Sequence, residues 1–411
     1  MHTLCPAWIR CINQGKVHLA MDPTQNPYRP GAGTQPPALL GRDELIDRFG
    51  VTVRRAVAGR PGKSLMPIGL RGVGKTVLLN RFSDIAQQEG LQVGFIEAPE
   101  TGDFRTLLAV RLRKILLQLE KKGPAATVLR ALRVLKTFTL KIPDGPTIAI
   151  DVDAIKGEAD SGVLSQDLPD LLLAVGEAVA EQRTGLLLAI DEVQYLSGEE
   201  LGALITAIHR TSQRDLPVVL VGAGLPQLPG LAGEAKSYAE RLFDFPEVGS
   251  LAADEAADAL RIPAQNLDVD FTDDALRVIV GEAHGYPYFL QEWGYHVWNH
   301  ATASPVTEGD VRSVRPVVID QLDRNFFLVR FDRLTPKEKE YLRTMAELGR
   351  GPHRSGDIAA RLGVKVESVA PRRSGLILKG MIYSPAHGDT AFTVPLFDQY
   401  LRRAMPNWPP R

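Results

Sequence analysis

The sequence predicts an α/β fold, in which a parallel sheet with helices on both faces is followed by two mainly helical regions. Short apolar segments alternate with helix-patterned ones through the first 250 residues. A glycine-rich turn separates the apolar segment 64–68 from a helical pattern at 76–82. A second apolar segment, 185–190, ends in two acidic residues, as a fully buried parallel strand does at the sheet edge. The reactive side chains are therefore expected at the carboxyl edge of this sheet.

Length and composition indicate a globular protein of several domains. The chain has 411 residues, which is more than a single core usually holds. Hydrophobic residues make up 44% and charged residues 24%, as in soluble proteins. The two cysteines, Cys5 and Cys11, cannot form a disulfide framework. No apolar run reaches the ~18 residues of a membrane span, and the N-terminus lacks the apolar core of a signal peptide. A cytoplasmic location is expected.

Charge is unevenly distributed along the chain. Residues 331–411 contain 14 Lys and Arg against 8 Asp and Glu, a net charge of +6, while the other residues carry a net charge of -7. A basic terminal region on an acidic body indicates a polyanionic partner such as nucleic acid.

The glycine-rich turn matches the phosphate-loop pattern G-x-x-x-x-G-K-[ST] at every fixed position, from Gly69 to Thr76. Its backbone amides would hold phosphate oxygens at the positive end of the following helix. Lys75 would neutralise the β- and γ-phosphates of ATP, and the Thr76 hydroxyl would bind Mg²⁺. The residues expected to hold the nucleotide here are Gly69, Arg71, Gly72, Val73, Gly74, Lys75, Thr76 and Val77.

The acidic pair Asp191-Glu192 supplies the other groups that nucleotide hydrolysis needs. Asp191 is expected to hold Mg²⁺ together with Thr76, and Glu192 to polarise the attacking water. Such a pair alone would more often cap a helix. About 115 residues after a phosphate loop, the catalytic interpretation is favoured.

The remaining elements follow from periodicity and turn signals. Residues 1–20 are expected to be a misassigned or disordered leader before a start at Met21, and residues 22–38 an extended arm. A hairpin inserted at 137–152 and a loop at 156–166 are also predicted. Predicted helices cover 104–122, 168–183, 199–214, 253–261, 272–282 and 287–300, with another starting at Thr307; predicted strands cover 92–96 and 217–222.

The C-terminal region has the pattern of a winged helix. Helices are predicted over 335–348, 355–363 and 366–378, the last as recognition helix, followed by a wing hairpin over 381–394. The predicted domains are a leader and arm (1–38, partly disordered), a nucleotide-binding core (39–250), a helical lid (251–330) and a winged helix (331–411).

The phosphate loop, the strand that ends at Asp191-Glu192 and the box Leu40-Gly41-Arg42-Asp43-Glu44 together resemble an AAA+ P-loop ATPase over roughly residues 38–300. With a lid and a winged helix, the arrangement is similar to archaeal origin-recognition initiators and to signal-transduction (STAND-type) ATPases. The resemblance implies that Leu40 and Gly41 lie near the adenine.

Three further positions follow from the resemblance. Tyr286 and Pro287, in a Gly-x-Pro motif, would pack near the base, although a proline in the first turn of a helix is equally consistent. Arg241 would be an arginine finger that reaches a neighbouring site; the alternative is a surface arginine. Residues 220–226 lack the polar residue with which the family senses the γ-phosphate, which implies slow hydrolysis.

In the winged helix, the expected DNA contacts are Arg372, Arg373, Lys379 and, at the tip of the wing, His387. The predicted function is an ATP-binding and ATP-hydrolysing switch whose nucleotide state repositions a winged helix on double-stranded DNA. The alternative is a signalling ATPase that forms homo-oligomers with shared ATP sites and uses the winged helix to bind a protein partner. No membrane partner is expected.

Overall fold

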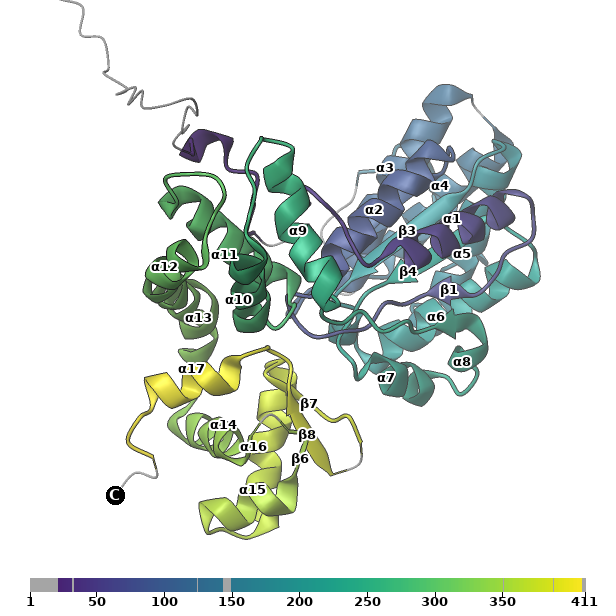
Figure 1. Ribbon diagram of the computed structural model, residues 1–411. Helices are drawn as coiled ribbons and strands as arrows, with labels where there is room; N and C mark the ends of the chain where they lie inside the picture. The colour runs from purple at the N-terminus through teal and green to yellow at the C-terminus, as the bar shows by residue number, and fades with distance from the viewer. Residues whose placement is uncertain are drawn as a thin grey trace, which may run out of the picture. The chain divides into compact units, whose positions relative to one another are not determined.

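The computed structural model of the protein describes residues 21–31, 33–123, 125–142, 149–349, 351–386 and 388–408 (Figure 1). The predicted leader, 1–20, lies outside this range. The chain divides into two compact units. One consists of the chain up to Gly41 together with Ser250–Arg333, and the other of Arg42–Gly249 together with Leu334–Arg411.

The second unit contains a five-stranded sheet in the order β2-β3-β4-β1-β5. Every neighbouring pair is parallel, because each strand is reached through a crossover with helices. The predicted parallel α/β sheet is therefore confirmed. The strands are β1 (Ser64–Leu65), β2 (Gln92–Glu97), β3 (Leu186–Asp191), β4 (Val218–Gly222) and β5 (Phe243–Asp244).

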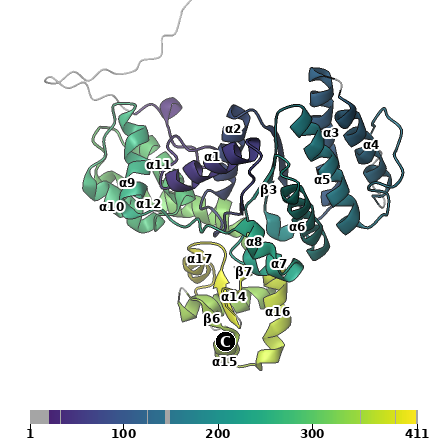
Figure 2. The ribbon, with the colours of Figure 1, turned by 90° about the vertical axis from the view of Figure 1, so that its right-hand side faces the viewer.

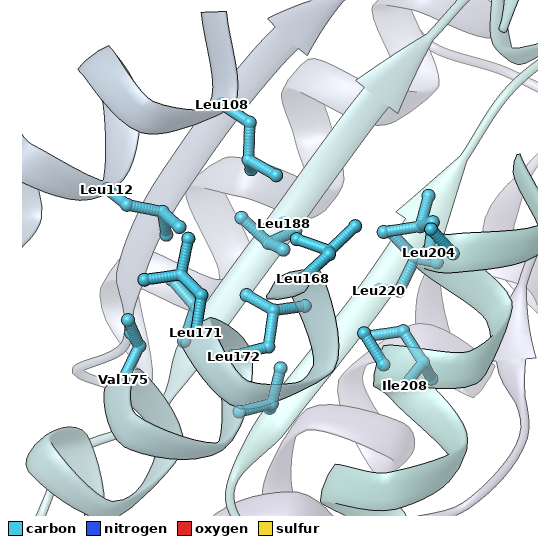
Figure 3. Close-up of a cluster of buried hydrophobic side chains, with 14 of the residues drawn as sticks. Leu108, Leu112, Leu168, Leu171, Leu172, Val175, Leu188, Leu204, Ile208 and Leu220 are labelled. Carbon is cyan, nitrogen blue, oxygen red and sulfur yellow. The ribbon is translucent and has the colours of Figure 1, made fainter. Parts of the chain in front are cut away.

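Helices cover both faces of this sheet (Figure 2). On one face lie α1 (Asp43–Val57) and α2 (Lys75–Gln88), joined by the stacked rings of Phe49 and Phe82. On the other face, leucines of α3, α5 and α6 form a cluster over β3 and β4 (Figure 3). The bounds on this face are α3 (Phe104–Lys122), α4 (Ala126–Leu140), α5 (Leu164–Glu181) and α6 (Gly198–Gln213).

The predicted hairpin over 137–152 is wrong in its first part. Residues 137–140 form the last turn of α4, which packs between α3 and α5. Phe138 continues a buried helix face that starts at Val128 and includes Leu135. The helical spacing of these buried residues, and not the strand-like composition of the segment, therefore determines its secondary structure. Residues 149–152 form no strand, and 143–148 lie outside the described residues.

The first unit is helical, and the arm that it includes packs against its helices. Tyr28 is only 2% exposed, and its hydroxyl donates a hydrogen bond of 2.5 Å to the Leu260 carbonyl. The Trp298 indole donates to the Asp22 carbonyl at 3.0 Å. The larger helices are α9 (Ala253–Gln265), α10 (Asp273–Ala283), α11 (Pro287–His300) and α12 (Glu308–Gln321), close to their predicted positions.

The C-terminal region combines helices with a small antiparallel sheet of order β6-β8-β7. A capping box between Thr335 and Glu338 starts its first helix, and Gly363, at φ 69°, ends its second. Its elements are α14 (Pro336–Leu348), β6 (His353–Arg354), α15 (Ser355–Leu362), α16 (Val366–Leu378), β7 (Ile382–Tyr383), β8 (Asp389–Phe392) and α17 (Phe397–Ala404). Within the described ranges, no helix combines the length and apolar character needed to cross a bilayer.

Candidate nucleotide site

The phosphate loop runs from the end of the β1 segment into α2, as the motif requires. Gly69 donates its amide to the Gly224 carbonyl at 3.1 Å. A Cβ at Gly69 would lie 2.1 Å from the Val248 carbonyl oxygen, so no larger residue fits there. Gly72 and Gly74 have φ angles of 81° and 91°, which L side chains rarely adopt. The glycines of the motif thus allow a close backbone contact and backbone conformations that a larger residue would not adopt.

Lys75, the first residue of α2, is buried and 7% exposed. Its ammonium donates to the carbonyls of Gly69 and Leu70 at 3.0 and 2.9 Å. Burial lowers the pKa of Lys75 to about 8, with a further decrease from Arg71, while Glu192 and Asp191 oppose the shift. The ammonium therefore lies against its own loop. When a nucleotide binds, it would exchange these two carbonyls for phosphate oxygens.

Thr76 and Asp191 lie together at the end of β3. The Thr76 hydroxyl donates to Asp191 Oδ2 at 2.6 Å, and burial raises the pKa of Asp191. A hydroxyl and a carboxylate are ligands that Mg²⁺ prefers, so the pair fits the predicted metal. No cluster of three or more His, Cys, Asp or Glu side chains capable of holding a metal exists in the described ranges, so nucleotide phosphates would have to complete the coordination.

Glu192 follows in a left-handed backbone conformation, at φ 53°. One carboxylate oxygen lies 3.4 Å from Arg71 Nη1 in an ion pair, and the other accepts a hydrogen bond from the Gln194 side chain. Both oxygens of the predicted base are therefore paired with protein groups.

Three residues of this site were not predicted. Gln194 Oε1 accepts the Leu225 amide at 3.0 Å, which places a side-chain amide at the end of β4, where the sequence offers no polar residue. The Tyr195 hydroxyl accepts from Arg71 Nη2 at 2.6 Å and lies 3.1 Å from Glu100 Oε1. The signal for Gln194 and Tyr195 in the sequence is their position directly after the acidic pair, and Glu100 has no such signal.

Comparison with known proteins agrees with this geometry. The family model described as an AAA ATPase domain matches residues 38–221. Residues 38–221 are an AAA ATPase domain. The prediction of an AAA+ P-loop ATPase is thereby confirmed. A second family model, a domain of unknown function (DUF8462), matches residues 324–401.

Three solved structures are similar to this chain at low sequence identity. A Walker-type ATPase of Pyrococcus abyssi is 16% identical, with a TM-score of 0.57, over 91% of this chain and 98% of that chain. The RuvB Holliday junction branch migration motor of Thermotoga maritima is 16% identical, with a TM-score of 0.43, over 88% and 95%. The Orc1 protein of Aeropyrum pernix, solved in complex with DNA, is 17% identical, with a TM-score of 0.44, over 90% and 94%. No curated protein matches the chain.

The other residues predicted for the AAA ATPase site lie apart from the phosphate loop in the chain. Arg241 is exposed on the short helix α8 (Ala239–Leu242) of the second unit. Leu40, Gly41, Tyr286 and Pro287 belong to the first unit. Pro287 is the first residue of α11, so the simple helix-start interpretation holds for it, and a role beside the base stays a prediction.

The predicted DNA contacts differ in availability. Arg373 donates to the Thr390 hydroxyl at 3.0 Å, to the Ser384 hydroxyl at 2.7 Å and to the Asp389 carbonyl at 2.9 Å. Lys379 forms a 2.7 Å ion pair with Glu338. These two side chains connect α16 to neighbouring elements of the same region, which the sequence did not indicate. Arg372, by contrast, is half-buried. His387 lies outside the described residues.

Proposed function

We propose that the protein is a cytoplasmic, ATP-binding and ATP-hydrolysing switch, and that the nucleotide state of its AAA ATPase domain changes how a C-terminal winged helix is presented to double-stranded DNA. The carrying observation is the convergence of Lys75, the Thr76–Asp191 pair and Glu192 at one edge of the sheet. The switch would have an ATP-bound state and an ADP-bound state, and the ADP of the second state is the product of hydrolysis.

Each of these side chains has a separate role in hydrolysis. Lys75 exchanges its two loop carbonyls for β- and γ-phosphate oxygens. Thr76 and Asp191 would hold Mg²⁺, which would neutralise charge on the phosphates. Glu192 accepts a proton from water as the water oxygen bonds to the γ-phosphorus; the bond from that phosphorus to the β–γ bridging oxygen breaks, and ADP leaves with the electron pair.

Substitution of the base tests the hydrolytic part. Glu192→Gln should retain ATP and reduce turnover by roughly 10²-fold or more, since the amide cannot accept the proton. Glu199→Gln, which changes an exposed acid at the start of α6, is the matched control and should behave as wild type. Affinity is measured with a fluorescent nucleotide and turnover by phosphate release. Equal turnover in Glu192→Gln and wild type would remove Glu192 from this role.

The DNA part is supported by the order of elements in the C-terminal region, three helices with a β-hairpin, and by its net charge of +6. Binding to random duplex DNA should weaken steeply with salt. Arg372→Ala should reduce the slope of log K against log salt by about 1, the share of one phosphate contact. Arg312→Ala removes the same charge from the first unit and should leave the slope unchanged. Absence of binding at low salt would contradict this part.

A second function, a signalling ATPase that presents this region to a protein partner, is favoured by one observation. Arg373 and Lys379 are engaged inside the region, which reduces the number of cations available to phosphates. A pull-down in which a protein, rather than DNA, copurifies stoichiometrically and depends on nucleotide would support it.

A further inference from the structure

The phosphate loop contacts the C-terminal region of its own unit at Arg71. The Arg71 amide donates to the Thr393 carbonyl at 3.0 Å. Thr393 in turn donates its hydroxyl to the Gly380 carbonyl and its amide to the Met381 carbonyl, the latter at 3.1 Å. Backbone on both sides of the β7–β8 hairpin is thereby attached to one residue of the loop.

The side chain of Arg71 meets the same surface. A Cβ added at Gly380 would lie 2.7 Å from Arg71 Nη2 and 3.3 Å from the Tyr195 hydroxyl. Gly380 therefore lies against the end of the guanidinium that bonds Tyr195 and pairs with Glu192. The absence of a side chain at Gly380 is what allows this position.

We propose that Arg71 is a positioning residue that holds Glu192 in an inactive pairing, and that the Gly380–Thr393 edge of the C-terminal region keeps Arg71 in that position. This inference rests on the proposed function, because it concerns the rate of hydrolysis at that site. Displacement of the edge, by DNA or by a protein, frees Arg71 and with it Glu192. The C-terminal region thus controls the rate of ATP turnover, in addition to responding to the nucleotide state.

Electrostatics explain why this pairing suppresses activity. One oxygen of Glu192 is in the ion pair with Arg71 and the other accepts a hydrogen bond from Gln194, so each oxygen already has a protein partner in place of a reacting water. Burial alone would lower the pKa of Arg71, but Glu192 and the Tyr195 hydroxyl raise it above its usual value, so the guanidinium stays charged. Arg71 cannot release Glu192 by deprotonation; it has to move.

The test uses the full-length protein and two glycine substitutions with the same backbone strain. Gly380→Ala adds a methyl group against Arg71, whereas Gly363→Ala, also at positive φ in the C-terminal region, adds one with no atom within 4 Å. Gly380→Ala should raise kcat for ATP by roughly tenfold, the shift expected from loss of one charge-assisted hydrogen bond, with the nucleotide Kd within about twofold of wild type. Gly363→Ala should turn over ATP as wild type does.

The role of Arg71 is tested in the same assay. Arg71→Ala should raise kcat as Gly380→Ala does, and the double variant should exceed neither single variant, because both act on one interaction. Arg71→Lys should give an intermediate kcat, since a single ammonium cannot bridge Glu192 and Tyr195 as the guanidinium fork does. Additive effects in the double variant would overturn the proposal.

Hydrogen exchange distinguishes failure of this inference from failure of the proposed function. The Arg71 amide, bonded to Thr393, should exchange faster in Gly380→Ala than in Gly363→Ala, whether or not ATP is hydrolysed. Equal exchange, or a kcat for Gly380→Ala no higher than for Gly363→Ala, overturns the inference. Loss of nucleotide binding or insensitivity of turnover to Glu192→Gln instead contradicts the proposed function.

Discussion

At the scale of single residues, the site depends on charges that are buried before any phosphate arrives. Lys75 is the clearest case, because burial lowers its pKa from 10.5 to about 8. Two loop carbonyls hold the ammonium in the meantime. Phosphate oxygens would therefore offset the free-energy cost of burying this charge.

This shift predicts a pH dependence of nucleotide affinity. Phosphates raise the pKa of Lys75 again, so binding takes up a proton between about pH 8 and the pKa of the bound state. The ratio of ATP affinities of wild type and Lys75→Met should be constant below pH 8. Above pH 8 it should fall by about tenfold per pH unit, until the pKa of the bound state is reached. Titrations with a fluorescent nucleotide from pH 6.5 to 9.5 measure it, and a ratio that stays constant to pH 9.5 would contradict the expected pKa.

The sequence predicts roles for the motif residues but does not predict their partners. The spacing of Gly69, Lys75 and Thr76 is local, so a strand, a loop and a helix start were enough to interpret it. The contacts of Glu192 with Arg71 and Gln194 are set by tertiary packing and by a left-handed backbone at φ 53°. No sequence pattern encodes those contacts, and for the same reason Tyr195 was missed.

At the scale of elements, periodicity was informative where a helix or strand has one buried face. The helix predicted over 104–122 agrees with α3. Composition misled at 137–140, where Thr and Phe are typical of strands but the buried face belongs to α4. The Pro- and Gly-rich composition of the arm likewise does not indicate that Tyr28 is buried. A single buried ring produces no repeating pattern of apolar residues in the sequence.

The arm offers a direct test of element packing. A Cβ at Gly294, in α11, would lie 2.6 Å from the Tyr28 ring. Gly294→Ala should therefore displace the arm and destabilise the first unit by about 1–3 kcal/mol. Gly281→Ala in α10 meets no atom within 4 Å and should stabilise it by about 0.5–1 kcal/mol.

Proteolysis measures this displacement. Chymotrypsin cleavage after Tyr28, which is buried in the packed arm, should be faster in Gly294→Ala than in wild type and not faster in Gly281→Ala. Equal cleavage rates for the two alanine variants would show that the ring does not hold the arm.

Arg373 provides a second test at this scale. Its three hydrogen bonds connect α16 to the β7–β8 hairpin, so Arg373→Ala should reduce the stability of the C-terminal region by about 1–3 kcal/mol. Arg372→Ala should leave stability nearly unchanged and affect DNA binding instead. Hydrogen exchange in residues 381–394 distinguishes the two variants. Equal protection in both would show that the hydrogen bonds of Arg373 do not stabilise the C-terminal region.

At the scale of the whole molecule, the charge is divided between an acidic body and a C-terminal region of net charge +6, and the nucleotide loop lies in the same unit as that region. A ligand on the C-terminal region can therefore affect hydrolysis through Arg71, without any change in the sheet. Reciprocal linkage applies to binding free energies and not to kcat, so this effect on turnover does not by itself require nucleotide to change the affinity of the region for its ligand.

Substitution of Arg241 tests whether one molecule is the functional unit. It is exposed on α8, and its side chain forms no ion pair within the part of the chain that the structure describes. If Arg241 completes a neighbour's site, Arg241→Ala and Glu192→Gln proteins are each inactive for different reasons. A mixture should recover about a quarter of wild-type turnover, because half of the chains retain a base and half of those have a neighbour with the arginine. Arg60→Ala, which changes another exposed arginine of the same unit, should be active alone. Phosphate release at increasing protein concentration measures recovery, and a mixture no more active than its components would identify a switch that works as a monomer.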